Sequence, residues 1–137
     1  MKLINIYDYD PGDRHRALWD LLAERTPDQS ISHREMPTYE RHVAFVESRP
    51  YAVWYFIAPD DDYEMIFGTL YLTVDREIGI QVFEKHHGYG VGTKAMEELN
   101  RIHKGPFLAN INPANEASIA FFEKHGFKHI QNTYRSE

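Results

Sequence analysis

The stretch EKHHGYGVGTKAMEEL, residues 84–99, holds the residues best suited to chemistry, with three glycines in five positions just before a run of helix formers. Gly88, Gly90 and Gly92 leave the backbone bare at this point. The first N–H groups of a helix lack internal acceptors, and the helix dipole adds partial positive charge there. The pattern therefore predicts a loop that binds a diphosphate. Basic residues surround it: Lys85, His86, His87 and Lys94.

Two familiar phosphate-binding loops do not fit this spacing. No G-x-x-x-x-G-K-[ST] string is present, and the glycines follow G-x-G-x-G rather than the G-x-G-x-x-G of dinucleotide-binding folds. A tight turn with a purely structural role is the alternative interpretation of these glycines.

The elements that must position the loop follow from hydrophobic periodicity. The pattern predicts helices over 14–26, 38–48, 93–103 and 115–125, and strands over 3–7, 51–58, 65–74, 77–83, 107–111 and 128–134. Asp13 is a predicted cap of the first helix, Pro37 or Thr38 begins the second, and Gly126 caps the last. Thr26-Pro27-Asp28 ends the first helix and Asp75-Arg76 forms a hairpin turn.

This order of elements predicts the fold class. Three consecutive strands with short turns favour an antiparallel meander, whereas the later alternation of strands and helices favours crossover connections. We therefore expect an α/β (α+β) fold with a mixed, mostly antiparallel sheet of about six strands flanked by four helices. The length of 137 residues predicts one domain, over residues 1–137.

Composition narrows the class of protein. A net charge of −6 argues against a nucleic-acid partner, and no cysteine is available for disulfides or thiolate metal sites. The N-terminal apolar run is broken by Asn5 and Asp8, so neither a secretory signal nor a membrane span is predicted. A cytoplasmic location is the expectation. The eight histidines form no chelating pair, and no metal is expected.

Two motifs resemble one family. EIGIQVFEKHHGYGVGTKAMEEL is similar to the acyl-CoA-binding motif of the GNAT superfamily of N-acetyltransferases, with His87, Gly90 and Gly92 at its fixed positions and histidine in place of the usual arginine or glutamine. NPANEASIAFFEKHGF is similar to the second signature of that family, through Asn115, Ser118, Lys124, Gly126 and Phe127. The resemblance covers about residues 31 to 134 and implies a sheet that splays between its fourth and fifth strands.

The resemblance implies an N-acetyltransferase that moves an acetyl group from acetyl-CoA to a primary amine of a small molecule or protein. The amine would attack the thioester directly in a ternary complex. A backbone N–H near Val82 or Phe83 would polarise the thioester carbonyl. The residues implied in acetyl-CoA binding are Gln81, Val82, Phe83, His87, Gly88, Tyr89, Gly90, Val91, Gly92, Thr93, Asn115, Ser118, Phe122 and Lys124.

Proton transfer needs a base and an acid. Glu77 is the candidate general base, with a cross-strand ion pair or a solvated hairpin residue as the alternative. Family members often carry a tyrosine, the usual acid, where this chain has Phe122, so water, another tyrosine or solvent must protonate the thiolate. Tyr134 is the candidate acid, and Tyr89 the second choice. His33 and Glu35 lie where the acceptor enters in some relatives, or belong to a surface loop.

The first half of the chain bears on the acceptor, and the C-terminal end bears on the assembly. Aromatic residues of the first half line an acceptor pocket or belong to the core: Trp54, Tyr55, Phe56, Tyr63, Phe67 and Tyr71. The same region resembles the branch that acetylates nucleotide-linked amino sugars. A degenerate acyl-CoA-binding sensor without activity, and a nucleotide-binding protein unrelated to CoA, are the competing functions. A sheet edge left bare near the C-terminus predicts a homodimer.

Overall fold

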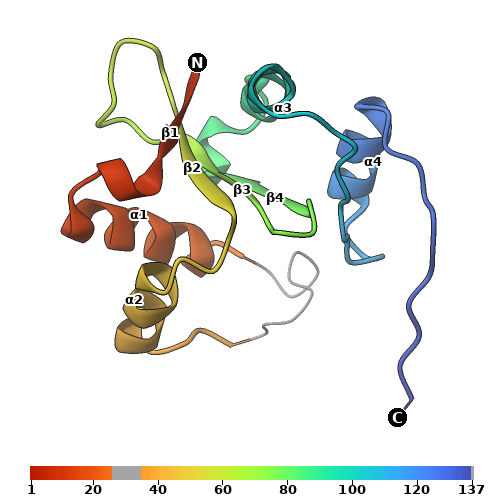
Figure 1. The fold of residues 1–137 in the computed structure, drawn as a ribbon, viewed down its shortest axis with the longest axis horizontal. Coiled ribbons are helices and arrows are strands. Elements are labelled where there is room, and N and C mark those ends of the chain that lie inside the picture. Colours follow the sequence, from red (N-terminus) through yellow and green to blue (C-terminus); the bar gives the residue numbers. More distant parts are fainter. Residues whose placement is uncertain (26–34, 137) are drawn as a thin grey trace.

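A computed structural model of the chain describes residues 1–25 and 35–136 (Figure 1). The strands are β1 (Lys2–Asn5), β2 (Val53–Ala58), β3 (Gly68–Leu72) and β4 (Ile78–Val82). The helices are α1 (Pro11–Ala23), α2 (Tyr39–Glu47), α3 (Val91–Ile102) and α4 (Glu116–Lys124), with short 3-10 turns η1 (Ile6–Asp8) and η2 (Glu84–His86). The predicted helix end at Thr26-Pro27-Asp28 lies outside the described residues.

The sheet has four strands in the order β1-β2-β3-β4, and every pair is antiparallel. Tyr55 pairs with Leu70, and Leu70 pairs with Ile80, which fixes the register across three strands. Because side chains alternate between the faces of a strand, this register decides which residues reach each side of the sheet.

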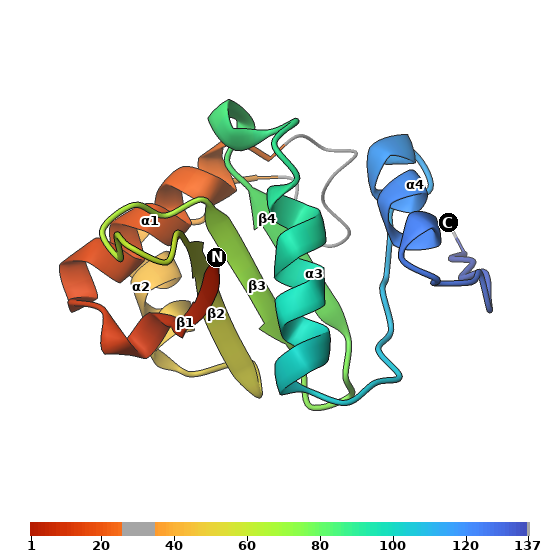
Figure 2. The same ribbon diagram turned by 90° about the horizontal axis from the view of Figure 1, so that it is seen from above.

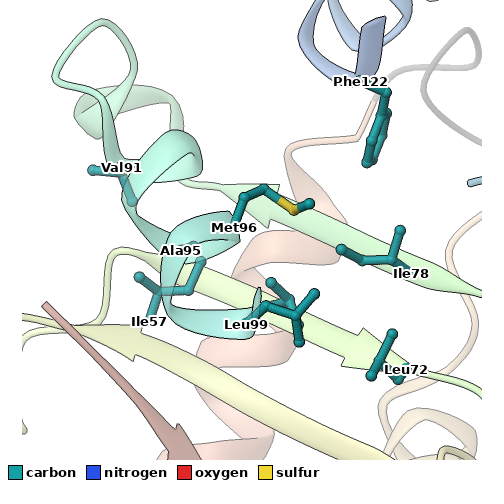
Figure 3. Packing of buried hydrophobic residues seen from close by; sticks show 9 residues of the cluster. Ile57, Leu72, Ile78, Val91, Ala95, Met96, Leu99 and Phe122 are labelled. Carbon is teal, nitrogen blue, oxygen red and sulfur yellow. The ribbon is translucent and has the colours of Figure 1, made fainter. Parts of the chain in front are cut away.

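Helices cover both faces of the sheet. α1 and α2 lie on one face, over a core that contains Ile6, Leu18, Leu21, Val46, Trp54 and Phe56, and α3 lies on the other (Figure 2). Val91, Ala95, Met96 and Leu99 recur at helical spacing on α3 and are buried against Ile57, Leu72 and Ile78 (Figure 3). The structure therefore has helices on both sides of a sheet, as the sequence predicts.

The caps explain where the helices begin and end. Thr38 caps α2, as predicted, because its hydroxyl accepts from the Arg41 N–H at 3.2 Å. Gly126, with φ +87°, ends α4 as predicted, and Phe127 donates to the Phe122 carbonyl while their rings pack together. Asp13 was the wrong cap for α1.

The observed ends of α1, β1 and α3 differ from the predicted ones. Asp10 is the N-cap of α1 because Pro11 takes the first helical position, which leaves Asp13 within the first turn. β1 ends at Asn5 because the Asn5 side chain caps η1. α3 begins at Val91, two residues before the predicted start at Thr93.

The expected six strands are not confirmed: the described residues form four. The segment 107–111 makes one isolated parallel bridge, between Glu77 and Leu108, before the chain leaves β4 for the turn that precedes α4. The segment 128–134 forms no strand and is exposed throughout, because 107–111 offers no strand edge for it to pair with. It runs along the outside of the molecule beyond α4 (Figure 1).

Candidate active site

The glycine loop between η2 and α3 exposes unpaired backbone amides. Gly88 and Gly90 have φ of +83° and +76°, values that glycine adopts without strain. The first backbone bond of α3 runs from the Lys94 N–H to the Gly90 carbonyl, at 3.1 Å. Among the described residues, no hydrogen-bond acceptor faces the amides of residues 88–93, and no side chain caps the helix. A Cβ at Gly88 or Gly90 would meet nothing within 4 Å, so the loop is open to an anion.

The second half of α4 packs beside the first turn of α3. A Cβ on Gly92 would lie 2.9 Å from Cε1 of Phe121, so the missing side chain lets α4 approach. The Thr93 hydroxyl lies 3.2 Å from Nε2 of His125, the residue that ends α4. Gly92 and Thr93 therefore position α4, while their N–H groups stay available to a ligand.

β4 has an open outer edge next to the loop. The Ile78 N–H donates to the Leu108 carbonyl at 2.7 Å, whereas Phe83 N–H donates to Phe67 on the inner side. By the alternation of an antiparallel ladder, the peptide groups of Ile78, Ile80 and Val82 face outward. In the described part of the chain, no strand covers this edge after Leu108. We call the unpaired stretch of the β4 edge, from the Glu77–Leu108 bridge toward the glycine loop, the gap.

The three residues predicted to border the gap, Gln81 and Val82 of β4 and Phe83 just after it, have different surroundings. Val82 presents its peptide group to the gap, and its carbonyl accepts from Nε2 of His87 at 2.8 Å. The Gln81 side chain instead donates to the Leu21 carbonyl at the end of α1, and Phe83 packs on the α1 face. Ile80 faces the gap and was missed, because only the pairing register reveals which peptides point outward.

The predicted residues of α4 have structural partners. Oδ1 of Asn115 caps the helix by accepting from the Ser118 N–H at 3.1 Å. Phe122 is 6% exposed and packs on the α3 face with Met96 and Ile78 (Figure 3). Lys124 is exposed at the last turn. The contacts of Asn115 and Phe122 explain these two residue types without a ligand, and coenzyme binding by all four residues stays a prediction.

Glu77 and the candidate acids differ in position. Glu77 is half-buried at the closed end of the gap, where its N–H donates to the Thr73 hydroxyl at 3.0 Å. Tyr134 is 89% exposed on the outer segment and Tyr89 is 78% exposed on the loop. Nothing among the described residues brings either hydroxyl to the gap. Glu35 is exposed, and His33 lies outside the described residues.

The aromatic residues predicted for the acceptor pocket divide by face. Trp54 and Phe56 are buried in the α1–α2 core. Tyr55 points to the α3 side, where its hydroxyl lies 2.8 Å from Nε2 of His103. Only Tyr71 lies next to β4 on the face where α1 ends. Tyr63 is exposed, and Phe67 packs on His86.

A family comparison decides what this arrangement is. The model of the acetyltransferase (GNAT) family matches residues 15–127, which include the loop, β4 and α4. The chain belongs to the GNAT family. No curated protein matches the chain significantly.

GNAT proteins are acyltransferases that use acetyl-CoA, so an acyl-CoA substrate and an acceptor follow for this chain. The match does not distinguish the branches of the GNAT family, so it gives no support to the amino-sugar branch. Within the described residues, no group of His, Asp or Glu side chains could hold a metal, and no helix is long and apolar enough to cross a membrane.

Proposed function

We propose that the protein is an N-acetyltransferase that moves the acetyl group of acetyl-CoA to a primary amine by direct attack. The observation that carries this proposal is the row of free amides at residues 88–93, next to the open edge of β4. The diphosphate would bind these amides, and the pantetheine arm would follow the β4 edge toward the bridge at Glu77.

Polarisation of the thioester and deprotonation of the amine each have a candidate group at this gap. The outward N–H of Val82 or Ile80 would polarise the thioester carbonyl and stabilise the negative charge that develops on its oxygen. Glu77, at the closed end, would take the proton from the attacking amine, directly or through water. Asn115, Ser118 and Lys124 stay candidate contacts for the coenzyme. Tyr134 also stays a prediction, with no contact that favours it.

Calorimetry with CoA and acetyl-CoA, followed by thiol release with a panel of primary amines, tests the proposal. We expect both coenzymes to bind and at least one amine to give free thiol. Absence of heat with either coenzyme, and of any competition between them, would disprove the proposal. Binding without thiol release for every amine would instead indicate the acyl-CoA sensor. Nucleotide-linked amino sugars belong in the panel because the first half of the chain resembles that branch.

We also propose that the protein is a homodimer. The segment 128–136 carries exposed apolar side chains, with Ile130 74% and Tyr134 89% exposed, and Leu108 of the singly bridged segment is 42% exposed. Pairing of these segments between two copies would cover them. Light scattering across a hundredfold concentration range should give the mass of a dimer, and Ile130→Asp should shift it toward a monomer. A monomer at the highest concentration would overturn the dimer. The one-domain organisation of residues 1–137 and the cytoplasmic location stay predictions.

A further inference from the structure

Tyr71 lies across β4 at the position where the gap opens. It pairs directly with Gly79, and a Cβ on Gly79 would lie 2.1 Å from Cζ and 2.5 Å from the hydroxyl oxygen of Tyr71. The space that a side chain would fill at residue 79 is therefore occupied by the phenol end of Tyr71. Only glycine allows this close approach.

This position puts the Tyr71 hydroxyl over β4, the strand that borders the proposed site. Gly79 follows Ile78, the last β4 residue bonded to Leu108, so the phenol lies at the closed end of the gap. Residues 77, 79 and 81 share one face of β4. The hydroxyl therefore lies on the same face as Glu77, about 7 Å further along the strand at about 3.4 Å per residue.

A second tyrosine holds Tyr71 in place. The Tyr51 ring stacks on the Tyr71 ring, with centroids 3.8 Å apart and planes 6° apart. Burial, and then the charge and hydrogen bond of the neighbouring Tyr71 hydroxyl, raise the pKa of Tyr51 well above its usual range. Tyr51 therefore keeps its proton, and its stacked ring fixes the Tyr71 ring over Gly79.

We propose that Tyr71 is the general acid that protonates the departing thiolate, an inference that rests on the proposed acetyltransferase function. The amine nitrogen forms a bond to the carbonyl carbon, the C–S bond breaks, and its electron pair goes to sulfur. Sulfur takes the Tyr71 hydroxyl proton, and the phenolate recovers the proton that the amine released to Glu77. The net products are an amide and free CoA thiol. Tyr51 is a positioning residue in this reaction.

The test is Tyr71→Phe, which keeps the ring over Gly79, with Tyr9→Phe as the matched control. Tyr9 packs on Phe56 on the same face of the sheet, and its hydroxyl donates to the Tyr63 carbonyl, away from the gap. We expect Tyr71→Phe to lower kcat about 10²-fold, with acetyl-CoA affinity unchanged by calorimetry. Tyr9→Phe should keep the wild-type kcat.

Two smaller acetyl donors separate acid catalysis from a structural effect. S-acetyl-N-acetylcysteamine releases a strongly basic alkyl thiolate, whereas S-(4-nitrophenyl) thioacetate releases a weakly basic aryl thiolate, which needs no proton to leave. The ratio of wild-type to Tyr71→Phe kcat/KM should be large with the first donor and near one with the second. Equal ratios, or an unchanged kcat with acetyl-CoA, would overturn the assignment of Tyr71. Failure of the wild type to bind acetyl-CoA or release thiol would instead overturn the proposed function.

Discussion

The side-chain amide of Gln81 on β4 donates a hydrogen bond to the carbonyl of Leu21 on α1, with Nε2 and O 2.5 Å apart. This bond fixes the C-terminal end of α1 against the strand that borders the gap. A second bond, from the Glu84 N–H to the Glu24 carboxylate at 2.9 Å, attaches the same end of α1 to η2. These two bonds therefore hold the C-terminal end of α1 against β4 and η2.

Replacing Gln81 should affect stability more than coenzyme binding. Gln81→Leu removes the bond to Leu21, and we expect the free energy of unfolding in urea to fall by about 1 kcal/mol. Acetyl-CoA affinity should stay the same, because the side chain points away from the β4 edge. Gln131→Leu, an exposed position, is the control. A large loss of affinity with unchanged stability would support direct coenzyme contact by the Gln81 side chain.

Two glycine-to-alanine substitutions that cause similar backbone strain test whether the glycine loop binds the coenzyme. Gly90→Ala places a side chain at φ +76°, and Gly126→Ala places one at φ +87°, with nothing within 4 Å of either Cβ. Both substitutions should cost similar stability, about 1 kcal/mol. Only Gly90→Ala should weaken acetyl-CoA binding, by about tenfold or more, because it alone covers the amides. Equal affinities of the two variants in calorimetry would contradict diphosphate binding at this loop.

Acidification should lower the free energy of unfolding, and protonation of His42 should account for part of this loss. This side chain is 6% exposed beneath α1, and burial is the main reason that its pKa lies below the value of 6.5 for an exposed histidine, although its bond to the His15 carbonyl raises the pKa in part. The unfolded chain therefore binds a proton below about pH 6.5 that the folded chain does not, and stability decreases as the pH falls below that value.

His42→Gln isolates this contribution, since glutamine keeps a donor for the His15 carbonyl but does not titrate. Urea unfolding at pH 7 and pH 5 should show a smaller pH-dependent loss for His42→Gln than for the wild type. Burial, and then the charge of Lys85, also lower the pKa of His86. His86 therefore contributes to the pH-dependent loss of stability equally in both proteins. The bonds from Arg14 and His15 lower the pKa of Glu47, so its contribution is lost only below about pH 4.5. Identical loss in the two proteins would assign the effect to other groups.

Phe122 should behave as a core residue. Phe122→Ala removes a ring packed with Met96, Ile78 and Phe127, and should cost about 3 kcal/mol or more of unfolding free energy. Phe45→Ala, at a side chain that is 47% exposed, is the control and should cost less. Phe122→Leu, which keeps most of the volume, should retain acetyl-CoA affinity. A loss of affinity in a stable Phe122→Leu protein would show that the ring contacts the coenzyme.

Local signals in the sequence were enough for much of the fold. Thr38 and Gly126 cap their helices through contacts within a few residues, so their roles follow from residue type and spacing. The meander of β2, β3 and β4 uses short connections between neighbouring strands. The glycine loop was recognised for the same reason, because its glycines and the helix that follows are contiguous.

Features that depend on distant pairing were not predictable. The segment 107–111 is apolar enough for a strand, yet a strand needs a partner edge, and only Leu108 meets β4. The register set by Thr73 and Glu77 decides which β4 peptide groups face the gap. The sequence pattern predicts Gln81 at the gap, whereas it is the Ile80 peptide that faces outward. The contact of Tyr71 with Gly79 also follows only from that register.

The order of the sheet has a consequence for how the catalytic centre is assembled. The strands β2, β3 and β4 follow one another in the chain and can form hairpin by hairpin, whereas β1 pairs with β2 only after α1 and α2 intervene, as in the pair Lys2 and Ala58. α4 joins the sheet and α3 from outside, through Phe122, through Phe121 against Gly92, and through Thr93 with His125. We therefore expect α4, which would form the opposite wall of the proposed coenzyme site, to be the last element to dock and the first to detach.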